Sequence, residues 1–417
     1  MSRAAIPTAP PTPAVRHALG STFAAFIGAG FVFASFASRI PQVRDRLELV
    51  PSQLGLVLLA LAAGSLLALP LSGVIVHRIG TRRTVTLMAV VCAVGLSVIA
   101  LGYLQGVGFV LVGLFFLGFG NGAWDVAMNV QGADVERQLG KAIMPRFHAG
   151  FSVGTVAGAL LGAGMVTLSI SVTLHLLVVA VVVALAVPVL VRRFLPDGVG
   201  DGDSDRTAGE DGSKAGEGRT RDSVFVRWRE PRTLLVGFVV LAFALAEGAG
   251  NDWVSISLID SYQLPASVGA LGFATFLAAM TTMRWFGTQL LDRYGRVTVV
   301  RAMAVLATVG LLLFVFGTVP PVAFLGAVLW GLGAALGFPV GMSAAADDPQ
   351  AAAARVSVVA SIGYCAFLGG PPLIGLLGDH VTVLKGLLAV VVILGLAILA
   401  TPALQPLSPA PTDPAPR

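Results

Sequence analysis

The chain has 417 residues, of which 56% are hydrophobic and only 12% are charged, with a formal net charge of +5. Soluble domains carry roughly 25% charged residues, so this composition excludes an ordinary water-soluble globule. Apolar runs of more than about 18 residues recur along the chain, and each is long enough to cross about 30 Å of hydrocarbon as a helix. Strands of about ten residues with alternating polarity, which build transmembrane barrels, are not evident. The sequence predicts an all-α membrane protein.

Twelve membrane-spanning helices are predicted, and they fall into two groups of six. The spans lie near residues 17–41, 52–76, 84–103, 107–130, 144–167, 171–194, 233–257, 267–291, 298–317, 321–344, 354–377 and 383–402. The tails, 1–16 and 403–417, are rich in Pro, Ala and Thr and predict disorder. Most of segment 195–231 is Gly, Asp, Ser, Glu and Arg, which predicts a flexible linker. We therefore expect two six-helix bundles, 17–194 and 232–402.

The two groups of helices repeat one another in sequence. Val50-Pro51 matches Leu264-Pro265, and at the same offset Gly73 matches Gly287. A repeat of this length indicates a duplicated six-helix bundle, an arrangement common among membrane transporters.

Basic residues are distributed unevenly between the loops. The tails and the loops after the even-numbered spans hold most of the 27 Lys and Arg residues, whereas the opposite loops hold only Arg44, Arg46 and Lys385. Because basic loops remain in the cytoplasm, we expect a multi-pass protein of the cell membrane with both termini and the linker cytoplasmic. The same distribution argues against a nucleic-acid partner.

Polar residues line one face of the span at 107–130. Asn121, Asp125 and Asn129 follow one another at four-residue spacing, which places them on one side of a helix. An ionisable group in mid-membrane costs roughly 2.5–3.5 kcal/mol on insertion scales, so this stripe is expected to face the interior of the bundle. It predicts a substrate or proton site with Asp125 as the titrating group. The alternative is a hydrogen-bonded ladder between helices.

A second polar stripe lies in the span at 233–257. It consists of Glu247, Asn251 and Ser255, with Asp252 beside it. We expect the neighbouring Gly248 and Gly250 to loosen this helix, as in the discontinuous helices that bind solutes in transporters. The internal repeat places Phe33 opposite Glu247 and Ser38 opposite Asp252, and acids present in one half alone favour a function. For Asp252, a position near the outer membrane interface is the alternative.

Four further residues are candidates, each with a structural alternative. His148 is predicted to relay protons, since its unperturbed pKa is near 6.5, or to pack by hydrogen bonding. Arg284 is expected either to extend to the interface or to pair with a carboxylate in the cavity. Tyr364 is expected to stack on a solute ring or to serve packing. Arg39, near the outer end of the first span, is expected to extend to the interface or to serve as a site residue.

The loop at 73–83 reads GVIVHRIGTRR, and its counterpart at 287–296 reads GTQLLDRYGR. This pattern of glycine, acid, base, glycine and basic cluster resembles the signature of the major facilitator superfamily. The resemblance implies a cytoplasmic gate formed by Gly73, His77, Arg78, Gly80, Arg82, Arg83, Asp292 and Arg293. His77 stands where the signature usually has Asp, so we expect weaker charge pairing at the gate in the first half.

Three further stretches resemble a narrower group, the YbjJ-like branch of that superfamily, which is related to sugar permeases of the fucose-permease kind. They read GNGAWDVAMNVQGADVE at 120–136 with MPRFHAGFSVG at 144–154, EGAGNDW at 247–253, and GYCAFLGGPPLIGLLGD at 363–379.

The resemblance and the two stripes together predict a secondary transporter that works by alternating access. The expected solute is small and polar, with sugar-like molecules first, and Asp125 and Glu247 are expected to couple transport to protons. No Walker-type or HExxH motif is present, and we expect no enzymatic activity, cofactor or metal. The expected partners are the solute, protons and the lipid bilayer, and the protein is expected to act as a monomer. The alternatives are a proton-coupled efflux antiporter for a drug or metabolite, and a non-transporting sensor or scaffold.

Overall fold

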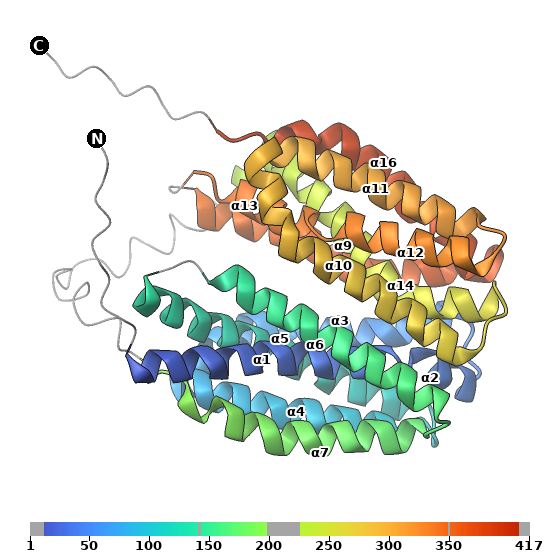
Figure 1. The fold of residues 1–417 in the computed structure, drawn as a ribbon, viewed down its shortest axis with the longest axis horizontal. Coiled ribbons are helices and arrows are strands. Elements are labelled where there is room, and N and C mark those ends of the chain that lie inside the picture. Colours follow the sequence, from blue (N-terminus) through green and yellow to red (C-terminus); the bar gives the residue numbers. More distant parts are fainter. Residues whose placement is uncertain (1–11, 141–142, 198–225, 349–350, 408–417) are drawn as a thin grey trace, which may run out of the picture.

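The computed structural model describes residues 12–140, 143–197, 226–348 and 351–407. Within these residues all regular secondary structure is helical, and twelve segments are long and apolar enough to cross a membrane. Figure 1 shows the helices in two bundles, with the first half of the chain in one and the second half in the other. The predicted linker lies largely outside the described residues, as do most of the predicted tails.

Seven helices build the first bundle: α1 Pro13–Ala37, α2 Ile40–Arg46, α3 Pro51–Ile79, α4 Thr81–Gly102, α5 Val107–Leu139, α6 Met144–Thr167 and α7 Val172–Leu190, which continues into a 3₁₀ turn at Val191–Arg193. The second contains α9 Pro231–Asp260, α10 Ala266–Tyr294, α11 Arg296–Phe316, α12 Pro320–Ala334, α13 Gly337–Ala345, α14 Ala352–His380, α15 Val383–Gly386 and α16 Leu388–Ala400, with a 3₁₀ turn at Thr401–Leu404. Proline occupies the first turn of α1, α3, α6, α9 and α12, where its missing N–H breaks no helical hydrogen bond.

Two predicted spans differ from the helices that form. The span at 17–41 is interrupted between Ala37 and Ile40, where α1 ends and α2 begins. The span at 321–344 is interrupted at Ala335 and Leu336, between α12 and α13. A proline follows each break, Pro41 after the first and Pro339 after the second, and the ring of a proline removes a helical N–H donor.

The internal repeat is visible in the backbone. Gly80 ends α3 and Gly295 ends α10, with φ of 81° and 74° respectively. Residues with a Cβ rarely adopt this conformation. Each glycine is followed directly by the next helix, α4 or α11. The same turn therefore recurs at equivalent positions of the two halves, in the loops that resemble each other in sequence.

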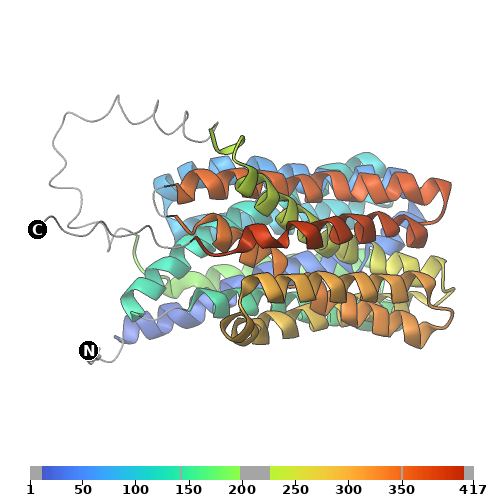
Figure 2. The ribbon, with the colours of Figure 1, turned by 90° about the horizontal axis from the view of Figure 1, so that it is seen from above.

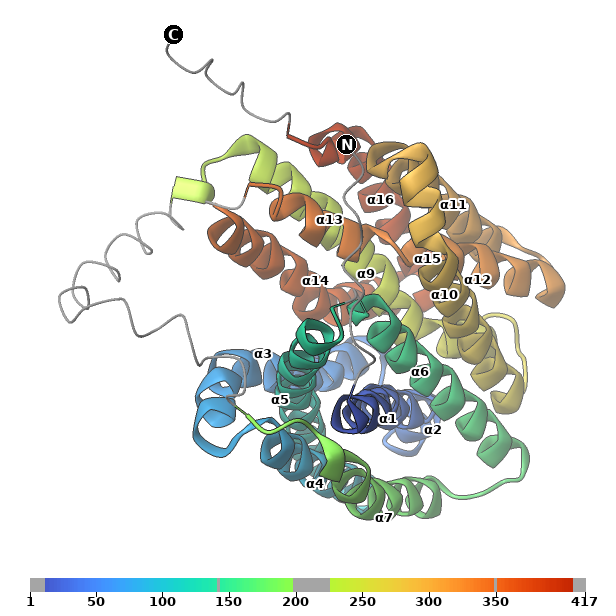
Figure 3. The ribbon, with the colours of Figure 1, turned by 60° about the vertical axis from the view of Figure 1, so that its left-hand side comes forward.

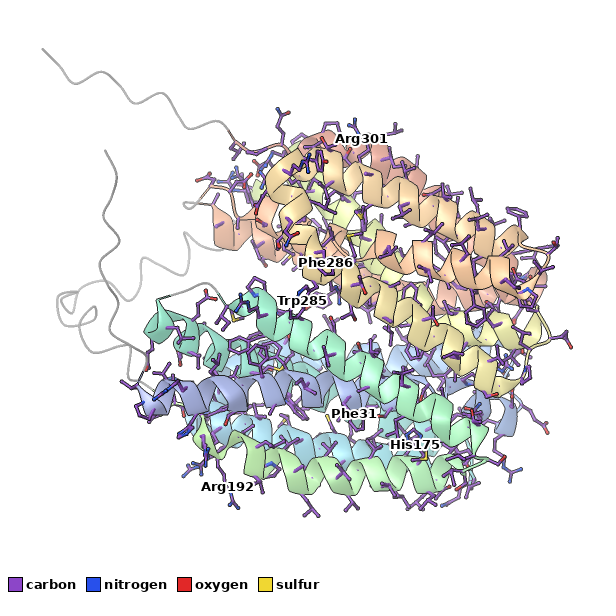
Figure 4. The ribbon with its side chains drawn as sticks, in the orientation of Figure 1. Phe31, His175, Arg192, Trp285, Phe286 and Arg301 are labelled. Atoms are coloured by element: carbon purple, nitrogen blue, oxygen red, sulfur yellow. The ribbon has the colours of Figure 1, made fainter. Side chains whose placement is uncertain are left out.

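Helices run along the long axis of the molecule (Figure 2), and both described ends of the chain lie at one end of it, here called the termini end. Arg192 lies near the termini end and His175 near the opposite, far end (Figure 4). The two halves meet chiefly through α3 with α14 and α6 with α10 (Figure 3), and also through α2 with α9.

Contacts between the halves close the far end. A Cβ on Gly55 of α3 would overlap the carbonyl oxygen of Pro371, and a Cβ on Gly375 of α14 would overlap that of Pro51. The Arg44 guanidinium at the far end forms an ion pair with Asp260 at the end of α9.

The backbone N–H of Ser52 also donates to Asp379 Oδ1 at 3.2 Å, again joining the two halves at the far end. Nearer the middle, Thr281 Oγ1 donates to the Ser152 carbonyl at 3.5 Å. At the termini end, by contrast, no hydrogen bond or ion pair joins the halves within the described ranges. The bundle is thus closed at one end and unlinked at the other.

Candidate functional site

A cavity of about 400 Å³ lies between the two halves. Its volume falls in the range of sites for small molecules, roughly 300–1,000 Å³. Helices α1, α3, α5 and α6 line it from the first half, and α9, α10, α13 and α14 line it from the second. The polar residues in its wall are Ser65, Asn121, Asp125, Glu247, Asn251, Asp252, Arg284 and Tyr364.

The two stripes predicted from the sequence face this one cavity. Asn121 and Asp125 reach it from α5, and Glu247, Asn251 and Asp252 reach it from α9. The place of Asp252 in the cavity wall favours the functional interpretation of this residue over a position at the outer interface. Asn129 does not line the cavity, but its Nδ2 donates to Asp125 Oδ1 at 3.2 Å and to the Asp125 carbonyl at 2.8 Å. Asn129 therefore holds the carboxylate in place.

Arg284 pairs with Glu247 across the cavity wall. Its Nη2 donates to Glu247 Oε2 at 2.7 Å, and its Nε donates to the Ala335 carbonyl at 3.4 Å, at the break between α12 and α13. Of the two possibilities open from the sequence, the ion pair is the one that forms. Glu247 and Arg284 therefore neutralise each other.

Asp125 and Asp252 have no such partner. No Lys, Arg or His in the described part of the chain forms an ion pair with either carboxylate, and Asp252 makes no hydrogen bond there. The side-chain oxygen atoms of Asn121 and Asn251 are buried and also lack a hydrogen-bond partner among the described residues. A buried polar atom without a hydrogen bond costs about 1–3 kcal/mol, so these two amides and two carboxylates are available to a ligand.

Aromatic side chains form much of the remaining wall. They are Phe33, Phe151, Phe338, Tyr364 and Phe367, and the Tyr364 and Phe367 ring centroids lie 6.4 Å apart. Tyr364 and the stretches around it were singled out in the sequence, but Phe338 was not. An apolar residue within an apolar helix gives no signal of its own.

Helix α9 is continuous through the stripe, contrary to expectation. It runs unbroken over Pro231–Asp260. Gly250 faces the Phe276 ring. Gly248 lines the cavity, and a Cβ added to it would lie 3.4 Å from the Phe367 ring. The two glycines therefore provide room for neighbouring aromatic rings and do not open the helix.

Two other basic candidates lie outside the cavity lining. His148 is exposed on α6, with its ring edge-on to Phe26 at a centroid distance of 5.2 Å. Arg39 is only 2% exposed, and its Nε donates to His175 Nδ1 at 2.9 Å while its Nη2 donates to the Ile170 carbonyl at 2.9 Å. The expectation that Arg39 extends to the interface is wrong, because its side chain is buried inside the first bundle, where it joins the turn between α1 and α2 to α7.

The predicted gate residues lie at the termini end and are mostly exposed. Within the described ranges, His77, Arg78, Arg82, Arg83 and Asp292 form no hydrogen bond or ion pair across the halves. Arg293 lies over the ring of its neighbour Tyr294, and a Cβ added to Gly73 would meet no atom within 4 Å. The residue after Gly80 is hydrogen-bonded within the first half: Thr81 donates its N–H and its hydroxyl to Asp197 Oδ1, at 2.8 and 2.7 Å respectively. The gate assignment stays a prediction.

One motif match carries no chemistry. Residues 150–154 read GFSVG, which fits the GxSxG pattern of hydrolases. That pattern needs a strand-to-helix turn that exposes the serine, whereas Ser152 is 1% exposed within α6 and donates to the His148 carbonyl at 3.3 Å. It is a packing residue.

Known proteins resemble this chain along most of its length. The model of the Major Facilitator Superfamily matches residues 19–249. The uncharacterized transporter y4wD of Sinorhizobium fredii is 32% identical over 371 residues, covering 86% of this chain and 90% of that protein. An uncharacterized MFS-type transporter of Yersinia pestis is 28% identical over 365 residues, covering 86% of this chain and 88% of that protein.

Solved structures share the fold at low sequence identity. The nucleoside transporter NupG superposes with a TM-score of 0.75 at 13% identity, over 94% of this chain and 99% of that one. A bacterial homologue of the human lysosomal transporter Spinster, inward-facing and unoccupied, gives 0.74 at 14%, over 94% and 98%. The E. coli fucose:proton symporter FucP gives 0.58 at 15%, over 92% and 98%. From its family match, its relatives and its fold, this chain belongs to the Major Facilitator Superfamily.

Proposed function

We propose that this membrane transporter is a secondary active transporter, which moves a small polar solute by alternating access and couples that movement to protons. One observation carries the proposal: polar stripes from both halves line a single cavity that is closed at the far end and unlinked at the termini end. Rocking of the halves about this cavity would expose it to each side of the membrane in turn.

We place the termini end in the cytoplasm, on the distribution of basic residues in the loops. The state described here is then open to the inside, as is the Spinster homologue that it resembles. Reporter fusions that are active only outside the membrane should stay silent at residues 210 and 410 and be active at residue 105. External activity at residue 210 would reverse the orientation.

Proton coupling is assigned to the cavity carboxylates. Asp125 is the stronger candidate, because it has no cation partner among the described residues, whereas Glu247 is paired with Arg284. A carboxyl group that meets water in one state and a closed interior in the other gains and loses a proton readily.

Asp125→Asn and Glu247→Gln keep side-chain size and remove titration. In proteoliposomes, at least one variant should still exchange solute across the membrane but lose accumulation driven by a pH gradient. If both variants accumulate solute as the wild type does, with the same pH dependence, these carboxylates are structural.

The aromatic and leucine side chains of the cavity wall favour a second candidate, efflux of a more apolar drug or metabolite in exchange for protons. Transport into vesicles in which the protein has one orientation distinguishes symport from antiport. Under an imposed proton gradient, a symporter should concentrate the solute on the side into which protons flow, and an antiporter should concentrate it on the opposite side.

We also propose that the chain belongs to the YbjJ-like branch and acts as a monomer in the cell membrane. Each of the stretches that carry this resemblance contributes to the cavity wall, through Asp125, Phe151, Glu247 and Tyr364 among others. Relatives of the branch should therefore share their transported solutes more closely than the superfamily as a whole does. A dimer in native-mass measurements from lipid nanodiscs would contradict the monomer.

A further inference from the structure

The charges in the cavity wall do not balance. Three carboxylates line it, Asp125, Glu247 and Asp252, against one guanidinium, that of Arg284. Because Arg284 is committed to Glu247 at 2.7 Å, Asp125 and Asp252 are left without a positive partner among the lining residues. When both are ionised, the site carries two uncompensated negative charges.

The two carboxylates come from opposite halves of the protein. Asp125 extends from α5 and Asp252 from α9, and each has an asparagine beside it on the same helix. The buried side-chain oxygens of Asn121 and Asn251 accept no hydrogen bond from any residue that the structure describes. Oxygen acceptors thus face the cavity from both sides, so the fitting ligand brings donors.

Aromatic rings complete the site. Phe33 belongs to the first half, and Phe338, Tyr364 and Phe367 belong to the second. The face of an aromatic ring attracts a cation, and most strongly where water is excluded. Carboxylates, unpartnered oxygens and ring faces together recognise one chemical group best, a substituted ammonium.

We propose that the transported solute carries a protonated amine, which Asp125 and Asp252 bind from opposite halves while the aromatic side chains surround its carbon skeleton. This inference rests on the proposed transport function and names the class of its solute. A neutral polyol would leave both charges uncompensated, and an anion would be repelled. Because the ammonium contacts both halves, binding also draws them together around the cavity, as alternating access requires.

The test compares amines with matched neutral compounds and, in one set, with a matched anion. The purified full chain in nanodiscs is titrated at neutral pH with glucosamine, glucose and N-acetylglucosamine, and with tyramine, tyrosol and 4-hydroxyphenylacetate. We expect the amine of at least one set to bind about tenfold or more tightly than its uncharged counterparts, since one charge-assisted hydrogen bond is worth that factor. Tighter or equal binding of a neutral or acidic member, or no binding of either amine, overturns the proposal.

Variants then locate the amine. Asp125→Asn and Asp252→Asn should each lower amine affinity about tenfold or more while leaving the weak binding of the uncharged counterpart unchanged. Asp252→Glu retains the charge and should keep the preference. Asp134→Asn changes a carboxylate on α5 that is paired with Arg137 away from the cavity and should bind like the wild type. Equal loss in Asp134→Asn, or no loss in either cavity variant, contradicts the assignment.

Transport is measured separately by counterflow in proteoliposomes. An amine that binds in the cavity but does not exchange across the membrane would refute the transport function and leave the amine site standing. A neutral member that binds best and is transported would refute the amine and leave the transport function standing.

Discussion

The ion pair at the far end is expected to hold that end closed. Arg44 Nη2 donates to Asp260 Oδ1 at 2.9 Å, and Nη1 contacts the second carboxylate oxygen, so the pair is bidentate between the two halves. The Arg44 side chain is 11% exposed and that of Asp260 is 41% exposed. Removing either partner should therefore favour the state in which the far end opens.

The size of the effect follows from this exposure. Breaking a fully buried pair costs about 3–5 kcal/mol, and exposed pairs contribute roughly 0.2–1 kcal/mol. Since the carboxylate side is solvated, a value near the upper end of the exposed range applies, about 1 kcal/mol. That free energy corresponds to about a fivefold change in the ratio of the two states.

Spin labels report this ratio directly. Cysteines at Gln105 and Ser261, both exposed in far-end loops, carry nitroxides for electron–electron distance measurements. The background replaces Cys365, which is exposed, and keeps Cys92, which is buried. Arg44→Ala and Asp260→Ala should each raise the population of long distances about fivefold.

Arg46→Ala is the matched control, because Arg46 is exposed on the same short helix, α2, and forms no ion pair with described residues. The double variant Arg44→Ala with Asp260→Ala should differ little from either single variant, since one interaction is lost in all three. Unchanged distances in both single variants, or the same rise in the control, would refute the reasoning.

Three further predictions concern stability and closure. Hydrogen bonds from Arg355 hold the pKa of Glu230 below its ordinary value of 4.5. The pair therefore stabilises the fold above that pH, and its contribution is lost as the pH falls through the lowered pKa. Glu230→Gln removes this titration and should flatten the decline of the melting temperature below about pH 4.5. Arg39→Ala leaves His175 Nδ1 and a backbone carbonyl without a donor in a buried site, and should cost about 2–4 kcal/mol of stability. Gly55→Ala places a Cβ against the backbone of α14 and should open the far end, as seen with the same spin labels.

Each of these predictions has an outcome that contradicts it. A parallel acid decline in wild type and Glu230→Gln would show that other carboxylates dominate. An unchanged melting temperature in Arg39→Ala would mean that water satisfies the freed groups. A far end that stays closed in Gly55→Ala would mean that α14 shifts aside without parting the halves.

The sequence predicts the number of spans, their order and the two polar stripes. A long apolar run that crosses the membrane must form a helix to satisfy its backbone hydrogen bonds, and a charged residue within such a helix must face the interior of the bundle. The places where the chain departs from straight helices were not predictable in the same way. Pro41 and Pro339 follow the two breaks, but Pro70 and Pro371 lie inside helices that stay continuous, so a proline alone does not locate a break. The hydrogen bond from Arg39 to His175 on α7 at the first break leaves no local pattern either.

Site chemistry was predictable where helix periodicity alone decides it. The spacing of the stripe containing Asp125 fixes which face it occupies, and the cavity lies on that face. The partner of Arg284 is another matter: two outcomes fit the sequence equally, and only the packing of α9 against α10 selects Glu247. For His148 the sequence left a proton relay and a packing role equally open, and the residue lies outside the lining.

At the far end, α3 and α14 approach so closely at Gly55 and Gly375 that main chain meets main chain. A barrier made of side chains can loosen by degrees, as one rotamer after another changes. Main-chain atoms in contact have no rotamers, so this barrier separates as a whole or remains shut. The far end should therefore have no partly open state through which ions could leak, so the membrane potential is preserved while the solute is bound in the cavity.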